Sequence, residues 1–155
     1  MTESYIEPAD DGSTANLVAT AEIDIAAPAT RVWDALTDPA LIAKYFFGAQ
    51  VQTDWRPGSA IVWKGQYEGT SYEDKGTIVD FQPHRLLRVT HFSPMSGQPD
   101  EPENYHTLTY QLDERASNTH VSLSQDNNGS QEEAQHSVDN WATILAGLKK
   151  TAESV

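Results

Sequence analysis

The chain has 155 residues, a length typical of one domain with one hydrophobic core. Its 10 Lys and Arg against 23 Asp and Glu give a net charge of −13, which argues against binding nucleic acid through phosphates and against docking on anionic membranes. The absence of cysteine excludes disulfides, thiol catalysis and thiolate metal sites. No apolar run approaches the roughly 18 residues of a membrane-spanning helix, and no signal-peptide pattern opens the chain, so we expect a cytoplasmic protein.

The first part of the chain is polar and acidic and has no hydrophobic periodicity. This composition predicts a disordered tail over residues 1–14, followed by a single domain over residues 15–155. From residue 16 to residue 25, apolar residues alternate with polar ones, which predicts a half-buried strand.

Two short helices are predicted after this strand. Pro28 suits the first turn of a helix, where its missing N–H costs nothing, and Trp33 lies on the apolar face of that helix. Asp38 followed by Pro39 predicts the cap and first residue of a second helix, which Gly48 ends.

Strands separated by turn residues follow, and then one long helix. We place six strands at 50–54, 59–67, 72–81, 86–92, 105–112 and 119–125, and their short connections favour sequential antiparallel pairing. Ser130 and Glu133 form a capping box, and apolar residues at spacings of three and four continue to Ala152. The pattern predicts a long amphipathic helix whose apolar stripe packs against the sheet.

This order of elements is similar to the helix-grip fold of the START-like (SRPBCC) superfamily. The chain resembles specifically the branch named after the C-terminal domain of the activator of the heat-shock-protein-90 ATPase. The resemblance extends from Leu17 to Ala152. Its segments are I-A-A-P-A-T-R-V-W-D-A-L-T-D-P with Y-F-F, W-R-P-G-S, K-G-T-I-V-D-F-Q-P-H-R-L-L and N-W-A-T-I-L-A-G-L-K-K.

The resemblance implies an α+β fold with a curved, seven-stranded antiparallel sheet around the C-terminal helix. It also implies a cavity between sheet and helix that the two short helices close at one end. Superfamily members bind lipids, sterols, polyketides or hormones there, and some catalyse cyclisation or hydrolysis. The branch supplies no catalytic set to transfer to this chain, and we expect neither a cofactor nor a metal.

Strand parity predicts which residues face this cavity. We pair the strands at 86–92, 105–112 and 119–125 so that apolar residues face one another on the concave side. The predicted pairs are Leu87 with Tyr110, Val89 with Leu108, His91 with His106, Tyr110 with Val121, and Leu108 with Leu123.

Two imidazoles on one apolar face allow several interpretations. They could bind a metal, share a proton or orient a polar group of a ligand. No H-x-x-H, H-E-x-x-H or carboxylate cluster supplies a third metal ligand. We favour the interpretation in which His91 and His106 lie hydrogen-bonded and partly hydrated at the open rim of the sheet.

Aromatic residues are numerous for a small cavity, and core packing is the alternative role for each of them. Trp141 is the strongest candidate because it lies on the apolar stripe of the long helix. Glu68 and Asp74 flank a predicted hairpin, where a solvated turn is more typical than a catalytic pair of carboxylates. The predicted cavity lining is Trp33, Phe46, Phe47, Trp63, Tyr67, Phe81, Val89, His91, His106, Leu108, Tyr110, Trp141 and Leu145.

These features predict binding of a small hydrophobic or amphipathic molecule, such as a lipid or a polyketide-like compound. One alternative is an enzyme of the polyketide-cyclase or aromatase kind that uses a cavity His or Tyr as its acid–base group. Another is a protein-interaction module that modulates a chaperone partner.

Overall fold

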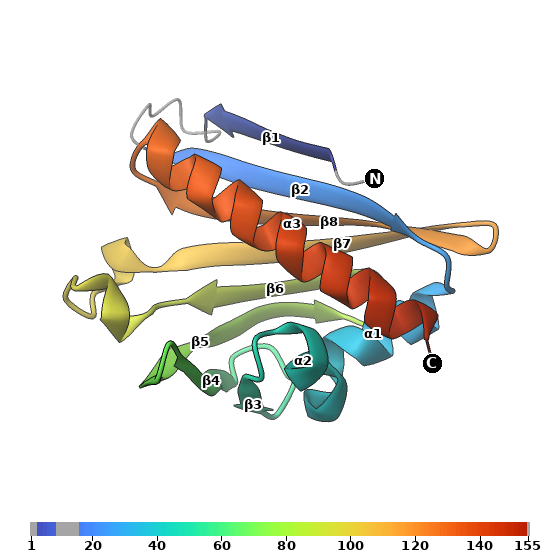
Figure 1. Ribbon diagram of the computed structural model, residues 1–155, viewed down its shortest axis with the longest axis horizontal. Coiled ribbons are helices and arrows are strands. Elements are labelled where there is room, and N and C mark those ends of the chain that lie inside the picture. The colour runs from blue at the N-terminus through green and yellow to red at the C-terminus, as the bar shows by residue number, and fades with distance from the viewer. Residues whose placement is uncertain (1–2, 9–15, 155) are drawn as a thin grey trace.

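An eight-stranded antiparallel sheet packs against one long helix that crosses its face (Figure 1). The computed structural model describes residues 3–8 and 16–154. The strands lie side by side in the order β1-β2-β8-β7-β6-β5-β4-β3. In chain order the elements are β1 (Glu3–Pro8), β2 (Leu17–Ile25), α1 (Ala29–Thr37), α2 (Pro39–Tyr45), β3 (Gln50–Thr53), β4 (Ala60–Tyr67), β5 (Thr70–Gln82), β6 (Leu86–His91), the 3-10 helices η1 (Pro94–Ser96) and η2 (Pro102–Asn104), β7 (His106–Arg115), β8 (Asn118–Asn128) and α3 (Gln131–Glu153).

The predicted α+β helix-grip fold is confirmed, but the sheet has eight strands and not seven. The additional strand is β1, which lies within the segment predicted to be a disordered tail, so that prediction is wrong for Glu3–Pro8. The strand forms because its backbone pairs with β2 and because Ile6 packs on a cluster of buried apolar residues from β2 and α3. The rest of the predicted tail lies outside the described residues.

The helix starts follow the capping chemistry of the sequence. The carbonyl of Pro28 accepts the amides of the first turn of α1, and the Asp38 side chain accepts the Ala40 amide at 3.0 Å to start α2. At α3, the Ser130 hydroxyl accepts the Glu133 amide at 3.1 Å. The Glu133 carboxylate in turn accepts the amide of Gly129, one residue before the cap, also at 3.1 Å.

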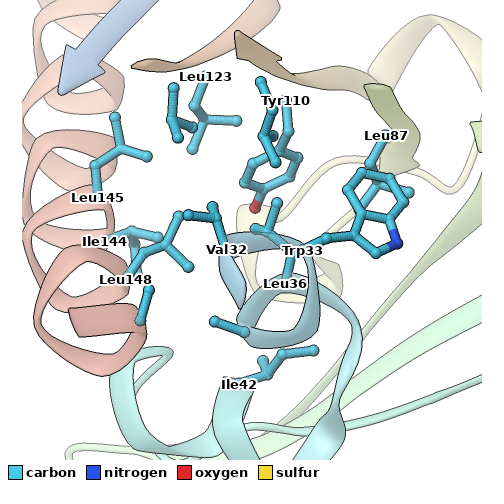
Figure 2. Packing of buried hydrophobic residues seen from close by; sticks show 14 of the residues in the cluster. Val32, Trp33, Leu36, Ile42, Leu87, Tyr110, Leu123, Ile144, Leu145 and Leu148 are labelled. Atoms are coloured by element: carbon cyan, nitrogen blue, oxygen red, sulfur yellow. The ribbon is translucent and has the colours of Figure 1, made fainter. Parts of the chain in front are cut away.

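Close packing fills the concave side of the sheet at the end where α1 and α2 lie (Figure 2). The C-terminal half of α3 meets both short helices there, and side chains from β6, β7 and β8 reach the same cluster. Burial of this apolar surface is the main source of stability for the fold. The labelled members are Val32, Trp33, Leu36, Ile42, Leu87, Tyr110, Leu123, Ile144, Leu145 and Leu148.

The predicted β6–β7 register is confirmed: Leu87 lies opposite Tyr110, Val89 opposite Leu108, and His91 opposite His106. The predicted β7–β8 register is wrong by two residues. Tyr110 is paired with Leu123 and not Val121, and Leu108 is paired with Gln125 and not Leu123. The reason is a two-residue turn between Arg115 and Asn118, tighter than the predicted link, with Ala116 at a φ of 56°.

Candidate ligand-binding site

A cavity of about 730 Å³ lies between the N-terminal half of α3 and the adjoining ends of β5 to β8. The loop that carries η1 and η2 lines one side, at the end of the sheet away from α1 (Figure 1). The cavity therefore lies at one end of the sheet, and the packed core fills the other end. The lining residues are Phe46, Phe47, Tyr67, Tyr72, Asp74, His91, Ser93, Met95, Ser96, Gln98, Asn104, His106, Gln125, Glu133, Asn140 and Trp141.

One side of the cavity is apolar and aromatic. The Trp141 ring lies 6.1 Å from that of Phe46, which lies 6.3 Å from that of Phe47. Phe47, Tyr67 and Met95 are respectively 54%, 57% and 54% exposed although their side chains are large and apolar. These three residues, which we call the apolar rim, all line the cavity. They place hydrophobic surface where a bound molecule would cover it.

Trp141 is held in place by a buried polar network. Its indole Nε1–H donates to Gln125 Oε1 at 2.8 Å, and Gln125 Nε2 donates to Ser137 Oγ at 3.1 Å. The Ser137 hydroxyl then donates to Asn128 Oδ1 at 2.7 Å. A satisfied network of this kind rigidifies its surroundings, because each buried polar group would be costly to leave unpaired. The indole therefore presents a fixed ring to the cavity.

His91 and Asp74 form a hydrogen-bonded pair on the polar side of the cavity. His91 Nε2 lies 2.9 Å from Asp74 Oδ2, and the two side chains are only 18% and 16% exposed. The ring of Trp63 meets the imidazole edge-to-face with 5.0 Å between ring centres. The other carboxylate oxygen, Asp74 Oδ1, is buried and has no hydrogen-bond partner among the described residues.

His106 lies opposite His91 in the sheet but has a separate partner. Its Nδ1–H donates to the backbone oxygen of Asp126 at 2.9 Å, which leaves Nε2 as the free nitrogen of the ring. Both imidazoles are thus hydrogen-bonded at the edge of the cavity. Within residues 3–8 and 16–154, no cluster of three His, Asp or Glu side chains is arranged to hold a metal ion.

The predicted lining residues divide into two groups. Phe46, Phe47, Tyr67, His91, His106 and Trp141 line the large cavity. The other seven do not, because the core fills the concave face where they lie. Of these, Trp63, Val89 and Tyr110 line a residual space of about 30 Å³, Trp33, Leu108 and Leu145 are buried in the core, and Phe81 packs half-buried against Trp33 with 5.3 Å between ring centres.

Tyr110 illustrates the difference between core and cavity. Burial raises the pKa of its hydroxyl well above the ordinary value, so that the phenol stays protonated. The neighbouring Tyr45 is partly buried, and its hydroxyl donates to the Ala35 carbonyl at 2.8 Å. These two hydroxyls therefore lie in the packed interior and not beside the large cavity.

Sequence reasoning missed Asp74 as a lining residue. The turn is shorter than predicted: Tyr67 pairs with Thr70 across Glu68 and Gly69, so β5 begins at Thr70, and Asp74, which the predicted strand at 72–81 already contained, lies opposite Trp63. Strand alternation contained the signal, because Asp74 shares a strand face with the buried Ile78. The polar lining from Gln125 and Asn140 could not be found in this way, because it depends on the tertiary packing of α3.

Across the described ranges, no helix is long and apolar enough to cross a membrane.

A sheet wrapped along a long C-terminal helix, with a cavity between the two, defines a helix-grip protein of the START-like class. The chain belongs to the family described as Activator of Hsp90 ATPase homolog 1-like proteins, whose model matches residues 26–153. No curated protein matches the chain significantly.

Solved structures are similar over most of the chain. ChR145 from Cytophaga hutchinsonii is 48% identical, with a TM-score of 0.78 over 88% of this chain and 94% of ChR145. CalU16 from Micromonospora echinospora is 21% identical, with a TM-score of 0.76 over 98% of this chain and 86% of CalU16. The Aha1 dimer from Colwellia psychrerythraea is 20% identical, with a TM-score of 0.68 over 86% of this chain and 94% of that one. The last two similarities concern the fold alone.

Proposed function

We propose that this protein binds a small amphipathic molecule in the 730 Å³ cavity. The observation that carries the proposal is that one open cavity is lined by both aromatic and hydrogen-bonding side chains. Its volume falls within the range of about 300–1,000 Å³ that is typical of ligand sites. The ligand-binding character of the fold supports the same function.

The two sides of the cavity would orient the molecule. The apolar part lies against Trp141, Phe46 and Phe47, where removal of apolar surface from water contributes roughly 25 cal/mol per Å². The polar part faces His91 and His106, whose own hydrogen bonds hold the imidazoles in place. The fixed indole of Trp141 lowers the cost of ordering the site on binding.

An enzyme of the polyketide-cyclase or aromatase kind is the second candidate function. The observation that favours it is the 2.9 Å contact between His91 and Asp74, because a carboxylate that orients an imidazole is an arrangement used in general-base catalysis. An enzyme would change the bound molecule chemically, whereas a binding protein would return it intact.

Binding can be tested by adding 1-decanol or 1-naphthol as probes and recording two-dimensional NMR spectra of the indole and backbone N–H groups. We expect saturable shifts of the Trp141 indole and of amides in β6 and the η1–η2 loop. Met95→Ser, which removes apolar surface from the apolar rim, should weaken the affinity about fivefold, since roughly 1 kcal/mol of binding free energy from apolar burial is lost.

Val79→Ser is the matched control, because Val79 is also exposed but lies on β5 away from the cavity. It should leave the affinity unchanged. Mass spectrometry of the probes after incubation separates binding from catalysis. The proposed function is wrong if neither probe shifts the Trp141 indole, or if Val79→Ser weakens binding as much as Met95→Ser.

A further inference from the structure

The polar side of the cavity contains an acceptor whose hydrogen-bonding capacity is only half used. Asp74 Oδ2 is bonded to His91, while Oδ1 is buried without a partner among the described residues. An ionised carboxylate is an acceptor only, so its complement is an N–H or O–H donor. A group that is both a donor and a cation forms the strongest such bond.

The charges around the cavity favour the same kind of group. Its lining includes the carboxylates of Asp74 and Glu133, and none of the described lining residues is Lys or Arg. Lys75, the next residue along β5, instead forms an ion pair with Asp100. With a net charge of −13 for the whole chain, the field at the cavity attracts cations and repels anions.

The aromatic side chains complete a cation site. Trp141, Phe47, Tyr67 and Tyr72 all line the cavity that Asp74 lines. The face of an aromatic ring attracts an ammonium group, most strongly for Trp, and the same rings bury an alkyl or aryl chain. A cavity lined by a carboxylate and several aromatic rings therefore suits a molecule that is cationic at one end and apolar at the other.

We infer that the cavity selects an amphiphile whose polar end is a protonated amine, which donates to Asp74 while its apolar chain lies against Trp141 and the apolar rim. This inference rests on the proposed function and names the chemical class of its ligand. Fatty acids and other anionic amphiphiles are disfavoured, because their carboxylates would face Asp74 and Glu133, and none of the described lining residues is a Lys or Arg that could balance the charges.

Three probes with the same chain, namely decylamine, 1-decanol and decanoate, test the inference at pH 7 below their critical micelle concentrations. We expect decylamine to bind about tenfold more tightly than 1-decanol, because a charged hydrogen bond is gained, and decanoate to bind most weakly. Affinities come from the Trp141 indole shift. Asp74→Asn should bring decylamine to within about threefold of 1-decanol, since the amide keeps the shape of the side chain but not its charge.

Asp80→Asn is the matched control, because it removes the same charge from the same strand outside the cavity. It should preserve the preference for the amine over 1-decanol. That result would show that the preference depends on contact with Asp74 and not on attraction by the net charge of the chain. The inference is overturned if decanoate binds as tightly as decylamine, or if Asp74→Asn leaves the preference intact. If 1-decanol binds and the amine gains nothing, only this inference fails, whereas the proposed function also fails if none of the three probes binds.

Discussion

Gly147 determines how closely α3 approaches α2. A Cβ atom at this position would lie 2.7 Å from the Cβ of Tyr45, well inside the contact distance of two carbon atoms. Tyr45 cannot move aside easily, because its hydroxyl is bonded to Ala35 and its partly buried ring packs against the main core. The absence of a side chain at Gly147 therefore allows α3 to pack closely on α2, and this packing positions the long helix over the cavity.

Gly147→Ala should therefore destabilise the protein. At an exposed helical position the change would stabilise by about 1 kcal/mol, but the clash with Tyr45 reverses the sign and should cost about 1–3 kcal/mol. Urea unfolding measures the free energy of unfolding. The neighbouring exposed position provides the control, since Ala146→Gly should cost only about 0.5–1 kcal/mol through helix propensity. A Gly147→Ala protein more stable than the wild type would contradict the packing argument.

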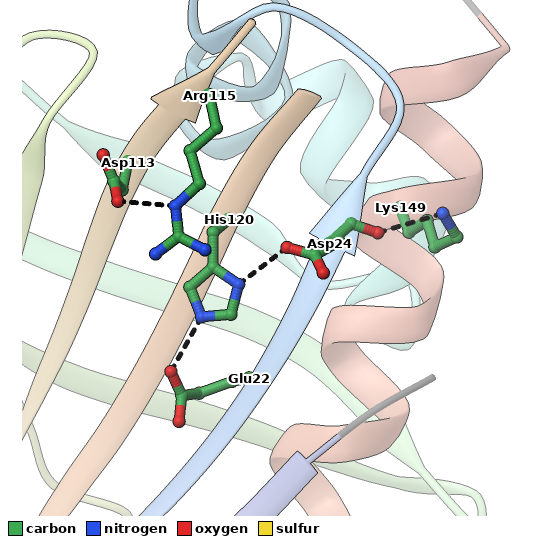
Figure 3. A network of polar contacts seen from close by, with 6 residues as sticks. All are labelled: Glu22, Asp24, Asp113, Arg115, His120 and Lys149. Atoms are coloured by element: carbon green, nitrogen blue, oxygen red, sulfur yellow. Dashed lines mark hydrogen bonds and ion pairs between the residues drawn. The ribbon is translucent and has the colours of Figure 1, made fainter. Parts of the chain in front are cut away.

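Strands β2 and β8 are joined on their exposed face by an imidazole held between two carboxylates (Figure 3). His120 Nδ1 lies 2.7 Å from Asp24 Oδ1, and His120 Nε2 lies 2.8 Å from Glu22 Oε1. Two carboxylate partners require a proton on each ring nitrogen, so His120 is an imidazolium in this arrangement. The bonds to Glu22 and then Asp24 raise the pKa of His120 above its ordinary value of 6.5.

This pairing should make stability depend on pH. Because the folded pKa of His120 is raised, its contribution is complete below about 6.5, the value in the unfolded chain, and is lost as the pH rises through the folded pKa. Glu22→Gln should lower the pKa of His120 and reduce this loss. Imidazole chemical shifts give the pKa, and urea midpoints between pH 5 and 9 give the stability.

Glu73→Gln removes an exposed carboxylate from another strand and should leave both measurements for His120 unchanged. A pKa of His120 at or below 6.5 in the wild type would show that the two carboxylates do not hold the imidazolium.

At the scale of the whole molecule, β1 extends the sheet beyond the part that encloses the cavity. Among the strands that the structure describes, it pairs with β2 alone at the edge of the sheet, and Ile6 covers Leu17, Ala19, Ala134 and Val138. The seven other strands and α3 hold the main core without it. We therefore expect the strand to add stability without being needed for the fold to form.

Deletion of residues 1–8 should lower the free energy of unfolding by about 1–3 kcal/mol, mainly through the exposure of apolar surface that Ile6 covers. Amide exchange should quicken in β2, which loses a neighbour, and stay slow in β6. Ile6→Ser should reproduce most of the loss, whereas Tyr5→Ser, at a 45% exposed position of the same strand, should have little effect. Global unfolding after the deletion would show that β1 is essential.

Local rules in the sequence determined the elements whose limits depend on their own residues. Asp38 and Ser130 start helices because each side chain accepts an amide of the first turn, and such chemistry requires no distant partner. Apolar alternation likewise determined which face of β6 and β7 points to the core, but a shift by two residues keeps that face, so the same rule gave the right register for β6–β7 and the wrong one for β7–β8. These features, with the order of elements, established the helix-grip fold.

Tertiary contacts alone decided the remaining features. Ile6 looks unremarkable in a polar segment and becomes part of a strand only because β2 and α3 present an apolar cluster to it. Tyr110 and Leu145 face the concave side as expected, yet they fill it, because α3 packs on α1 and α2 at that end. The cavity and its Asp74–His91 pair lie at the end of the sheet away from α1, and that position depends on how closely distant segments approach one another, which no local pattern encodes.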